Sequence, residues 1–138
     1  MKTKTIKKSE IKREWHLIDA QDKILGRLAC QVARFLIGKD KTSFVSHLDC
    51  GDYVVIVNAA KIKVTGRKAD QKKYYRHSGY PGGFRETTWR EQMEKDPRKI
   101  IRHAVSGMLP KNKLKDPRLV RLKIFPDENH PYKDKIRN

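Results

Sequence analysis

The sequence predicts one α/β domain with a mostly parallel sheet and helices on both of its faces. Strand patterns alternate along the chain with helical patterns, and this order of elements is typical of a parallel sheet. The segment Tyr53–Asn58 (YVVIVN) is almost wholly apolar and β-branched, as expected for a strand buried on both faces. An apolar stripe with helical spacing is formed by Leu25, Leu28, Ala29, Val32 and Leu36.

The first half of the chain is predicted to hold three strands and one helix. Trp15–Asp19 is a short apolar run before a turn, which indicates a buried strand. The helix of the apolar stripe ends at Gly38. After the strand Tyr53–Asn58, the alternating segment Lys61–Thr65 predicts a further strand that Gly66 closes.

In the second half, Tyr74 and Tyr75 begin a possible strand before a glycine-rich loop. Thr88 and Glu91 have the spacing of a capping box, so a short helix is expected from there to about Lys95.

Asp96 and Pro97 predict the start of a second helix, which Pro110 ends. Its buried stripe is expected to be Ile100, Ile101, Ala104, Val105 and Met108. The segment Leu119–Phe125 is expected to hold a helical turn and a last short strand. We expect residues 1–138 to form a single domain, with a basic N-terminal arm at 1–13 and an irregular C-terminal tail at 126–138.

The whole chain is strongly basic. Its net charge is +17, with 15 basic and 7 acidic side chains in residues 1–69 and 18 and 9 in residues 70–138. Because the excess is spread over both halves, it is not the property of a basic tail. A polyanion is the expected partner, with nucleic acid first and an anionic membrane surface second.

Several classes of protein fit the sequence poorly. No apolar run approaches ~18 residues, so no membrane-spanning helix is expected, and the basic N-terminus lacks the apolar core of a signal peptide. The two cysteines, Cys30 and Cys50, lack a C-x-x-C spacing, which favours free thiols in a reducing compartment.

The sequence does not match the motifs of nucleotide-binding or hydrolytic enzymes. Around Gly38-Lys39 a phosphate-binding loop of the G-x-x-x-x-G-K-S/T type would need glycine at Ala33 and a hydroxyl residue at Asp40. The glycines of the segment 79–83 have the wrong spacing for the dinucleotide fingerprint, and Pro81 removes an amide donor. G-x-S-x-G is absent. We therefore expect no catalytic residue, no cofactor and no small-molecule substrate.

The segment His47–Asp52 (HLDCGD) offers a histidine, two carboxylates and a thiol, which are ligand types of metal sites. No second histidine stands at helical or hairpin spacing from His47. Asp and Gly before a strand are more typical of a turn in which the carboxylate accepts hydrogen bonds from nearby amides. We expect no metal here.

Nucleic-acid binding accounts for more of the residues. The segment Lys73–Arg85 (KYYRHSGYPGGFR) combines basic residues that neutralise phosphates, tyrosines that can stack on bases or riboses, and glycines that permit close backbone approach. Part of it is expected to be structural, since alternate strand residues face opposite sides and one of Tyr74 and Tyr75 then faces the core.

Five blocks in order give this chain a family resemblance. They are WHLIDAQDKILGRLA, GKDK, HLDCGDYVVIVNAAKIKVTG, KYYRHSGYPGG and VSGMLPKNKL, and together they span roughly residues 13–125. On these blocks the chain closely resembles the bacterial ribosomal protein L-thirteen family of the large subunit. Two departures are that Cys50 stands where a small hydroxyl residue is common, and that the tail after Phe125 follows no common pattern.

The resemblance implies a three-layer α/β/α sandwich with a four-stranded, mainly parallel sheet. It also implies a structural component of the large ribosomal subunit in the cytoplasm. Such a protein binds large-subunit ribosomal RNA directly, helps early assembly, contacts neighbouring ribosomal proteins and is not an enzyme. The alternative is a basic RNA- or DNA-binding protein outside the ribosome.

The expected RNA-binding residues fall in four regions. They lie at the end of the first helix, before the glycine loop, within it, and after the G-M-L-P turn. They are Lys39, Lys41, Arg67, Lys68, Lys72, Lys73, Arg76, His77, Tyr80, Gly82, Gly83, Arg85, Lys111, Lys113, Lys115, Arg118 and Arg121.

Overall fold

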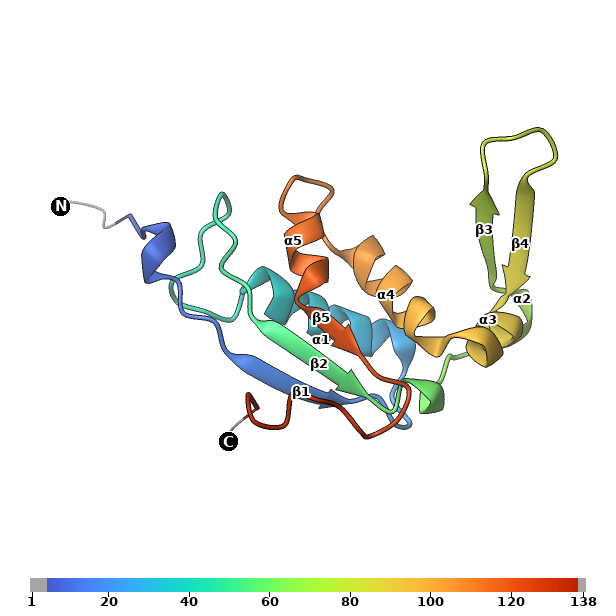
Figure 1. The fold of residues 1–138 in the computed structure, drawn as a ribbon, viewed down its shortest axis with the longest axis horizontal. Helices are drawn as coiled ribbons and strands as arrows, with labels where there is room; N and C mark the ends of the chain where they lie inside the picture. The colour runs from blue at the N-terminus through green and yellow to red at the C-terminus, as the bar shows by residue number, and fades with distance from the viewer. Residues whose placement is uncertain (1–4, 137–138) are drawn as a thin grey trace.

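A three-stranded parallel sheet forms the centre of the molecule. The computed structural model describes residues 5–136. Strands β1 (Trp15–Asp19), β2 (Tyr53–Val57) and β5 (Leu122–Ile124) lie in the order β1-β2-β5 (Figure 1). β2 is the middle strand, and Val54 to Val57 are all buried, which explains why its sequence is apolar throughout.

Helices cover one face of this sheet. α1 (Leu25–Ile37) and α4 (Pro97–Met108) pack against each other, and α5 (Lys115–Val120) contacts both of them (Figure 1). The register places Ile18 beside Ile56, and these two side chains join the buried stripes of α1 and α4 in one apolar core. Both expected helical stripes thus face the core, with Leu25 and Ala104 partly buried. Met108 was predicted to be buried, but it is the last residue of α4 and is 44% exposed.

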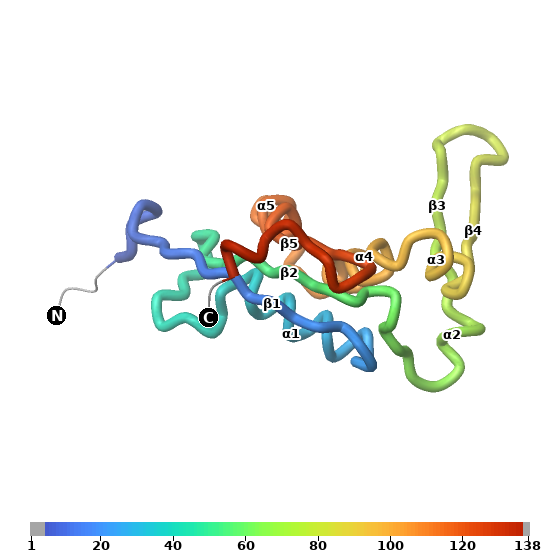
Figure 2. The backbone as a smooth tube through the Cα atoms, turned by 60° about the horizontal axis from the view of Figure 1, so that its bottom comes forward, coloured from blue at the N-terminus to red at the C-terminus, as the bar shows by residue number. Residues whose placement is uncertain are grey.

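The opposite face of the sheet packs against the C-terminal segment. Trp15 stacks on its register partner Tyr53 with ring centroids 4.3 Å apart, and Tyr132 stacks on Trp15 at 5.1 Å. Backbone hydrogen bonds fix this segment, among them Asn58 N–H to Asp127 O at 3.1 Å. Figure 2 shows it as the red tube beside the sheet. The expected second layer of helices is not confirmed, because aromatic rings of the tail lie where it was predicted.

The predicted strand Lys61–Thr65 is reduced to a single bridge. Residues Ala59–Lys61 form a 3-10 turn, η2, and only Lys63 pairs in parallel with Ile24, accepting a hydrogen bond from Leu25 N–H at 2.9 Å. The chain then leaves the sheet at Gly66. The parallel sheet of the described residues accordingly has three strands rather than four.

Helix boundaries agree with the sequence signals. Gly38 ends α1 with φ +82° and donates its N–H to Arg34 O at 2.9 Å. Thr88 begins α3 (Trp89–Lys95) with the expected capping box, since its hydroxyl accepts from Glu91 N–H. Asp96 caps α4 through Arg98 N–H at 3.2 Å.

A hairpin projects from one end of the molecule. Strands β3 (Lys73–His77) and β4 (Phe84–Thr88) pair only with each other, in an antiparallel sheet (Figures 1 and 2). The short helix α2 (Lys68–Gln71) and α3 flank its base. β3 was expected, whereas β4 was not.

The predicted terminal segments lie partly outside the described residues, which exclude 1–4 and 137–138. Within the described part of the N-terminal arm, Lys8–Glu10 form a 3-10 turn, η1, and the other residues up to Glu14 are irregular. Residues 126–136 contain no helix or strand.

Candidate nucleic-acid interface

The register of the hairpin brings two arginines together. Arg76 on β3 is the direct cross-strand partner of Arg85 on β4, so both side chains leave the same face. Within residues 5–136 neither guanidinium has a carboxylate within 4 Å. Like charges directly opposite each other destabilise a strand pair. An exposed pair of this kind is suited to an anion that contacts both guanidinium groups.

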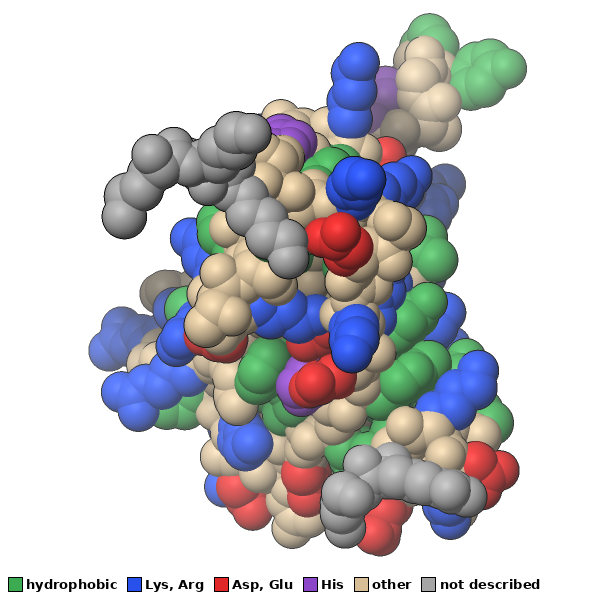
Figure 3. Space-filling model, turned by 90° about the vertical axis from the view of Figure 1, so that its left-hand side faces the viewer, with side chains coloured by type: hydrophobic (Ala, Val, Ile, Leu, Met, Phe, Trp, Pro, Cys, Tyr) green, Lys and Arg blue, Asp and Glu red, His purple; other side chains and the backbone are tan. Residues whose placement is uncertain are grey.

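The other face of the hairpin carries aromatic rings. Tyr75 stacks on Phe84 with centroids 5.7 Å apart, and these side chains are 66% and 56% exposed. Tyr80 at the tip is 76% exposed. In Figure 3 the tip rises above the rest of the molecule and bears large hydrophobic side chains. Exposed aromatic groups gathered on a projection are typical of a binding surface.

The glycines of the loop build a turn. Gly83 N–H donates to Tyr80 O at 2.9 Å across a turn with Pro81 and Gly82 in the middle, and Gly82 has φ +72°. These are the residue types that a type II turn requires. A Cβ on Gly83 would clash with the Ser78 hydroxyl. Gly82 and Gly83 are therefore needed for the turn itself, and the turn presents Tyr80.

His77 also takes part in this turn. Its Nδ1 accepts a hydrogen bond from Gly79 N–H at 2.9 Å, so this nitrogen carries no proton in that arrangement. The ring lies on the aromatic face, opposite Phe84 in the strand register.

Basic residues continue from the hairpin to its base. Arg67, Lys68, Lys72 and Lys73 are all exposed, as predicted for a surface that faces a polyanion. Lys73 forms an ion pair with Glu86 across the strands at 3.3 Å, and Lys72 lies over the Tyr74 ring at 5.7 Å. Burial raises the pKa of the Tyr74 hydroxyl, which therefore stays protonated. Tyr74 is thus the more buried ring of the Tyr74–Tyr75 pair.

Of the predicted basic residues after the G-M-L-P turn, the lysines lie at the surface and the arginines lie in the interior. Lys111 and Lys113 are exposed and Lys115 is half-buried. Arg118 and Arg121, by contrast, are only 2% and 6% exposed. Arg121 donates hydrogen bonds to both carboxylate oxygens of Asp49, and Arg118 Nε lies 3.7 Å from the same carboxylate. The structure assigns these two predicted contacts to the interior, where they cannot reach an RNA strand.

The two lysines after α1 also differ. Lys39 is exposed, whereas the Lys41 ammonium is directed inward and binds the Asp52 carboxylate together with the carbonyl oxygens of Lys12 (2.7 Å) and Cys50 (3.1 Å). All three hydrogens of the ammonium group therefore have acceptors. Lys41, like Arg118 and Arg121, holds the body of the protein together.

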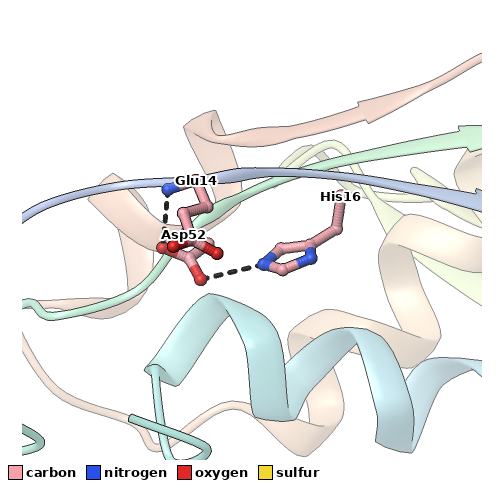
Figure 4. A group of neighbouring side chains, drawn as sticks. All are labelled: Glu14, His16 and Asp52. Carbon is pink, nitrogen blue, oxygen red and sulfur yellow. Dashed lines mark hydrogen bonds and ion pairs between the residues drawn. The ribbon is translucent and has the colours of Figure 1, made fainter. Parts of the chain in front are cut away.

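Three side chains lie close enough together to hold a metal ion: Glu14, His16 and Asp52 (Figure 4). One possible ligand atom of each lies within 4.8 Å of the others. However, Asp52 already accepts from Lys41, from Glu14 N–H at 3.0 Å and from His16 Nε2 at 2.9 Å. The Lys41 charge would repel a cation at the same carboxylate. This set of side chains fits an internal ion-pair network better than a metal.

The pKa values of the two aspartates agree with this role. Burial raises the pKa of Asp52, but hydrogen bonds from Lys41, the Glu14 amide and His16 outweigh it and hold the pKa below the ordinary value. Burial acts likewise on Asp49, and hydrogen bonds and charge from Arg121 outweigh it. The segment His47–Asp52 was predicted as a turn whose carboxylates bind nearby amides. Asp49 instead binds Arg121, 72 residues away, and Asp52 binds Lys41, 11 residues away. Arg13 donates to the Gly51 and Asp49 carbonyls.

Sequence reasoning missed two aromatic members of the candidate surface, Tyr75 and Phe84. The sequence signal that could have found them is the alternation of side chains along β3 and β4. Pairing of the two strands places both rings on one face, but β4 was not predicted.

Comparison with known proteins decides the family. A family model described as "Ribosomal protein L13" matches residues 13–131. This chain belongs to that family. The match covers almost all of the described residues, including the hairpin, Asp49 and Asp52, so the resemblance predicted from the five sequence blocks is confirmed.

Curated relatives support the assignment. The large ribosomal subunit protein uL13 of Dehalococcoides mccartyi is 52% identical over 132 residues, covering 96% of this chain and 92% of the relative. The proteins of the same name from Cupriavidus taiwanensis and Chromobacterium violaceum are 52% and 50% identical, each covering 96% of this chain and 93% of the relative. Membership in a family of ribosomal proteins supports the expectation that the chain is not an enzyme. Among residues 5–136, no helix has the length and apolarity needed to cross a bilayer.

Proposed function

We propose that this protein is a structural component of the large ribosomal subunit, located in the cytoplasm, and that it binds large-subunit ribosomal RNA directly. The proposal extends to early subunit assembly, in which a rigid basic body holds several RNA segments together. The names of its relatives support the ribosomal part, and the charge of +17 supports the RNA part.

The observation that carries the proposal is the unneutralised pair of Arg76 and Arg85 on the projecting hairpin. A phosphate group between the two guanidinium groups would turn an unfavourable cross-strand pair into a favourable one. The exposed residues Lys39, Arg67, Lys68, Lys72, Lys111 and Lys113 extend the proposed contact surface, with Lys73 and Lys115 beside it. RNA helices are recognised largely through phosphates, hydroxyls and shape, so a surface of this kind needs few base contacts.

Neighbouring ribosomal proteins are the second class of proposed partner. Apart from the hairpin, the described surface exposes Leu17, Met108 and Val120, which lie on separate elements. Leu17 and Val120 are candidates for such contacts, and we propose no membrane or small-molecule partner.

The test is RNA binding as a function of salt. Large-subunit ribosomal RNA fragments are titrated with the native protein and with Arg76→Ala/Arg85→Ala. Each lost phosphate contact lowers the steepness of log affinity against log salt by about 1, so a change of about 2 is expected. Lys23→Ala/Lys61→Ala is the matched control, because it removes two charges near the Asp19 carboxylate. An unchanged slope in the hairpin variant would contradict its role.

A second measurement separates the proposal from the alternative of a general nucleic-acid-binding protein. Binding to the ribosomal RNA fragments is compared with binding to duplex DNA at the same salt, and cell extract is sedimented. We expect preferential RNA binding and co-migration with large subunits. Equal affinity for both nucleic acids and migration apart from subunits would favour the alternative.

A further inference from the structure

A groove separates the hairpin base from the helical layer. Its volume is about 640 Å³, and it lies between the start of α1, the helix α4 and the segments that flank β3. Two of the expected RNA-binding residues, Lys68 and Lys72, are among the residues that line it. The size falls within the range of pockets that hold small organic groups.

The floor of the groove is apolar and aromatic. Ile100, Ala104 and Met108 of α4 line it together with Tyr74 and Trp89. His103 meets the Tyr74 ring edge-on at 5.4 Å, which fixes the position of that ring. A flat aromatic group is the kind of ligand that such a floor accommodates.

The rim of the groove is basic. Arg27, Lys68 and Lys72 line it, and no Asp or Glu is among its lining residues. Arg27 and Lys68 are exposed, with no carboxylate within 4 Å in the described chain, and the Lys72 ammonium rests over the Tyr74 ring. A ligand that combines an aromatic group with a negative charge would be complementary to both parts of the groove.

Trp89 adds an independent observation. Its indole N–H is buried and has no hydrogen-bond acceptor among the described residues. A buried donor without a partner is costly, and most such groups in folded proteins have one. Because Trp89 lines the groove, a ligand bound there could supply the missing acceptor, such as a carbonyl or ring nitrogen of a base.

We propose that the groove binds one unpaired nucleotide of an RNA strand. The base lies on the floor between Trp89, Tyr74 and Met108, and its phosphate meets Arg27, Lys68 and Lys72. The inference rests on the proposed function in taking RNA as the polymer, and it adds single-strand recognition to backbone binding. An apolar protein side chain would match the floor but would leave the three cations without a partner.

The indole N–H provides a direct probe. The chain has two tryptophans, Trp15 and Trp89, so the ¹⁵N-labelled protein gives two indole signals, which Trp89→Phe assigns. We expect hexaadenylate to shift the Trp89 signal and to leave the Trp15 signal in place. An RNA duplex should leave both in place, because its bases are not free to enter the groove. If hexaadenylate does not shift the Trp89 indole signal, the inference is overturned.

Ala104→Leu tests the groove by filling it, since residue 104 lines it in the middle of α4. Hexaadenylate should bind about tenfold more weakly, as expected when stacking of one base is lost. Cys30→Leu is the matched control, because it adds bulk to an exposed site on α1 outside the groove. Native affinity in Ala104→Leu overturns the inference.

A second variant covers the case in which Ala104→Leu fails to fold. Lys68→Ala/Lys72→Ala keeps the floor, so the Trp89 signal should still shift, but only at several-fold higher hexaadenylate. If ribosomal RNA binds with its normal salt dependence while the Trp89 signal never moves, the groove inference fails and the proposed function stands. A signal that moves only with another large-subunit protein overturns it in favour of a protein side chain.

Discussion

Arg121 and Asp49 form a two-pronged ion pair between positions 72 residues apart, with one nitrogen–oxygen distance of 2.6 Å. The same guanidinium donates to the carbonyl oxygens of Leu36 (3.1 Å) and Asp52 (3.3 Å). One side chain thereby joins the end of α1, the segment before β2 and the end of α5. Guanidinium geometry is essential here, because an ammonium group cannot donate in so many fixed directions.

Arg121→Ala should lower the free energy of unfolding by about 3 kcal/mol, because removing the buried arginine leaves the partly buried Asp49 charge without its main counterion. Urea denaturation measures this. The control is Arg90→Ala, which breaks the exposed pair with Asp70 and should cost less than about 1 kcal/mol. Equal losses in the two variants would show that the buried pair has no special role.

Acid should destabilise the protein through Asp49 and Asp52. Their pKa values are lowered in the folded state, so their contribution is present above the unfolded value of about 3.9 and is lost as the pH falls through the lower folded values. Unfolding free energies should therefore be nearly constant down to about pH 5 and fall below about pH 4.

Asp52→Asn isolates one of these carboxylates. The variant should be less stable at neutral pH and should lose less stability in acid than the native protein. Asp70→Asn, which alters an exposed pair, should keep the native acid dependence. If the acid transition of Asp52→Asn matches the native one, Asp52 does not contribute to it.

Gly51→Ala should prevent normal folding or cost several kcal/mol. A Cβ at Gly51 would collide with the Leu36 carbonyl and lie 2.8 Å from an Arg121 nitrogen, so it would disrupt the ion-pair network. Gly107→Ala is the comparison, because no atom lies within 4 Å of the added Cβ in α4. That change should stabilise the helix by roughly 0.5–1 kcal/mol. Thermal unfolding of both variants gives the contrast, and a tolerated Gly51→Ala would refute the close contact.

Arg76→Glu should change stability and binding in opposite directions. It places a carboxylate opposite Arg85, so the free hairpin should gain roughly 0.2–1 kcal/mol. RNA binding should weaken, because a phosphate would now meet a negative charge. Hydrogen exchange of the strand amides reports the first effect, and an RNA titration reports the second. Lys133→Glu makes the same charge change on the exposed tail, and an equal loss of binding there would show that only net charge matters.

Much of the fold was predictable because its signals are local. The caps at Thr88 and Asp96 and the terminating Gly38 mark boundaries within a few residues of sequence, and the structure agrees with each. The predicted strand at Lys61–Thr65 was wrong beyond one bridge. Its alternation is real, but the turn Ala59–Lys61 and the departure of the chain at Gly66 leave it no length to pair.

The candidate site was less predictable because its residues depend on distant partners. Lys41, Arg118 and Arg121 look like surface cations in sequence, and only the folded structure brings them to Asp52 and Asp49. The exposed cations of the hairpin were easier to select, since the nearby glycines and tyrosines indicated a loop suited to a sugar-phosphate surface. That Arg76 lies directly opposite Arg85 follows only from the pairing register of β3 and β4, and β4 was not predicted from the sequence.

The parallel pairing of Val54 with Leu122 makes the whole chain between β2 and β5 an excursion from the sheet, and the hairpin is its outermost part. Its strands pair with near neighbours in sequence, so the hairpin can close without waiting for the long-range contacts of the sheet. The hairpin can therefore change in length or composition while the register of the sheet stays the same. The proposed binding surface of the hairpin and the architecture of the core are in this sense separable.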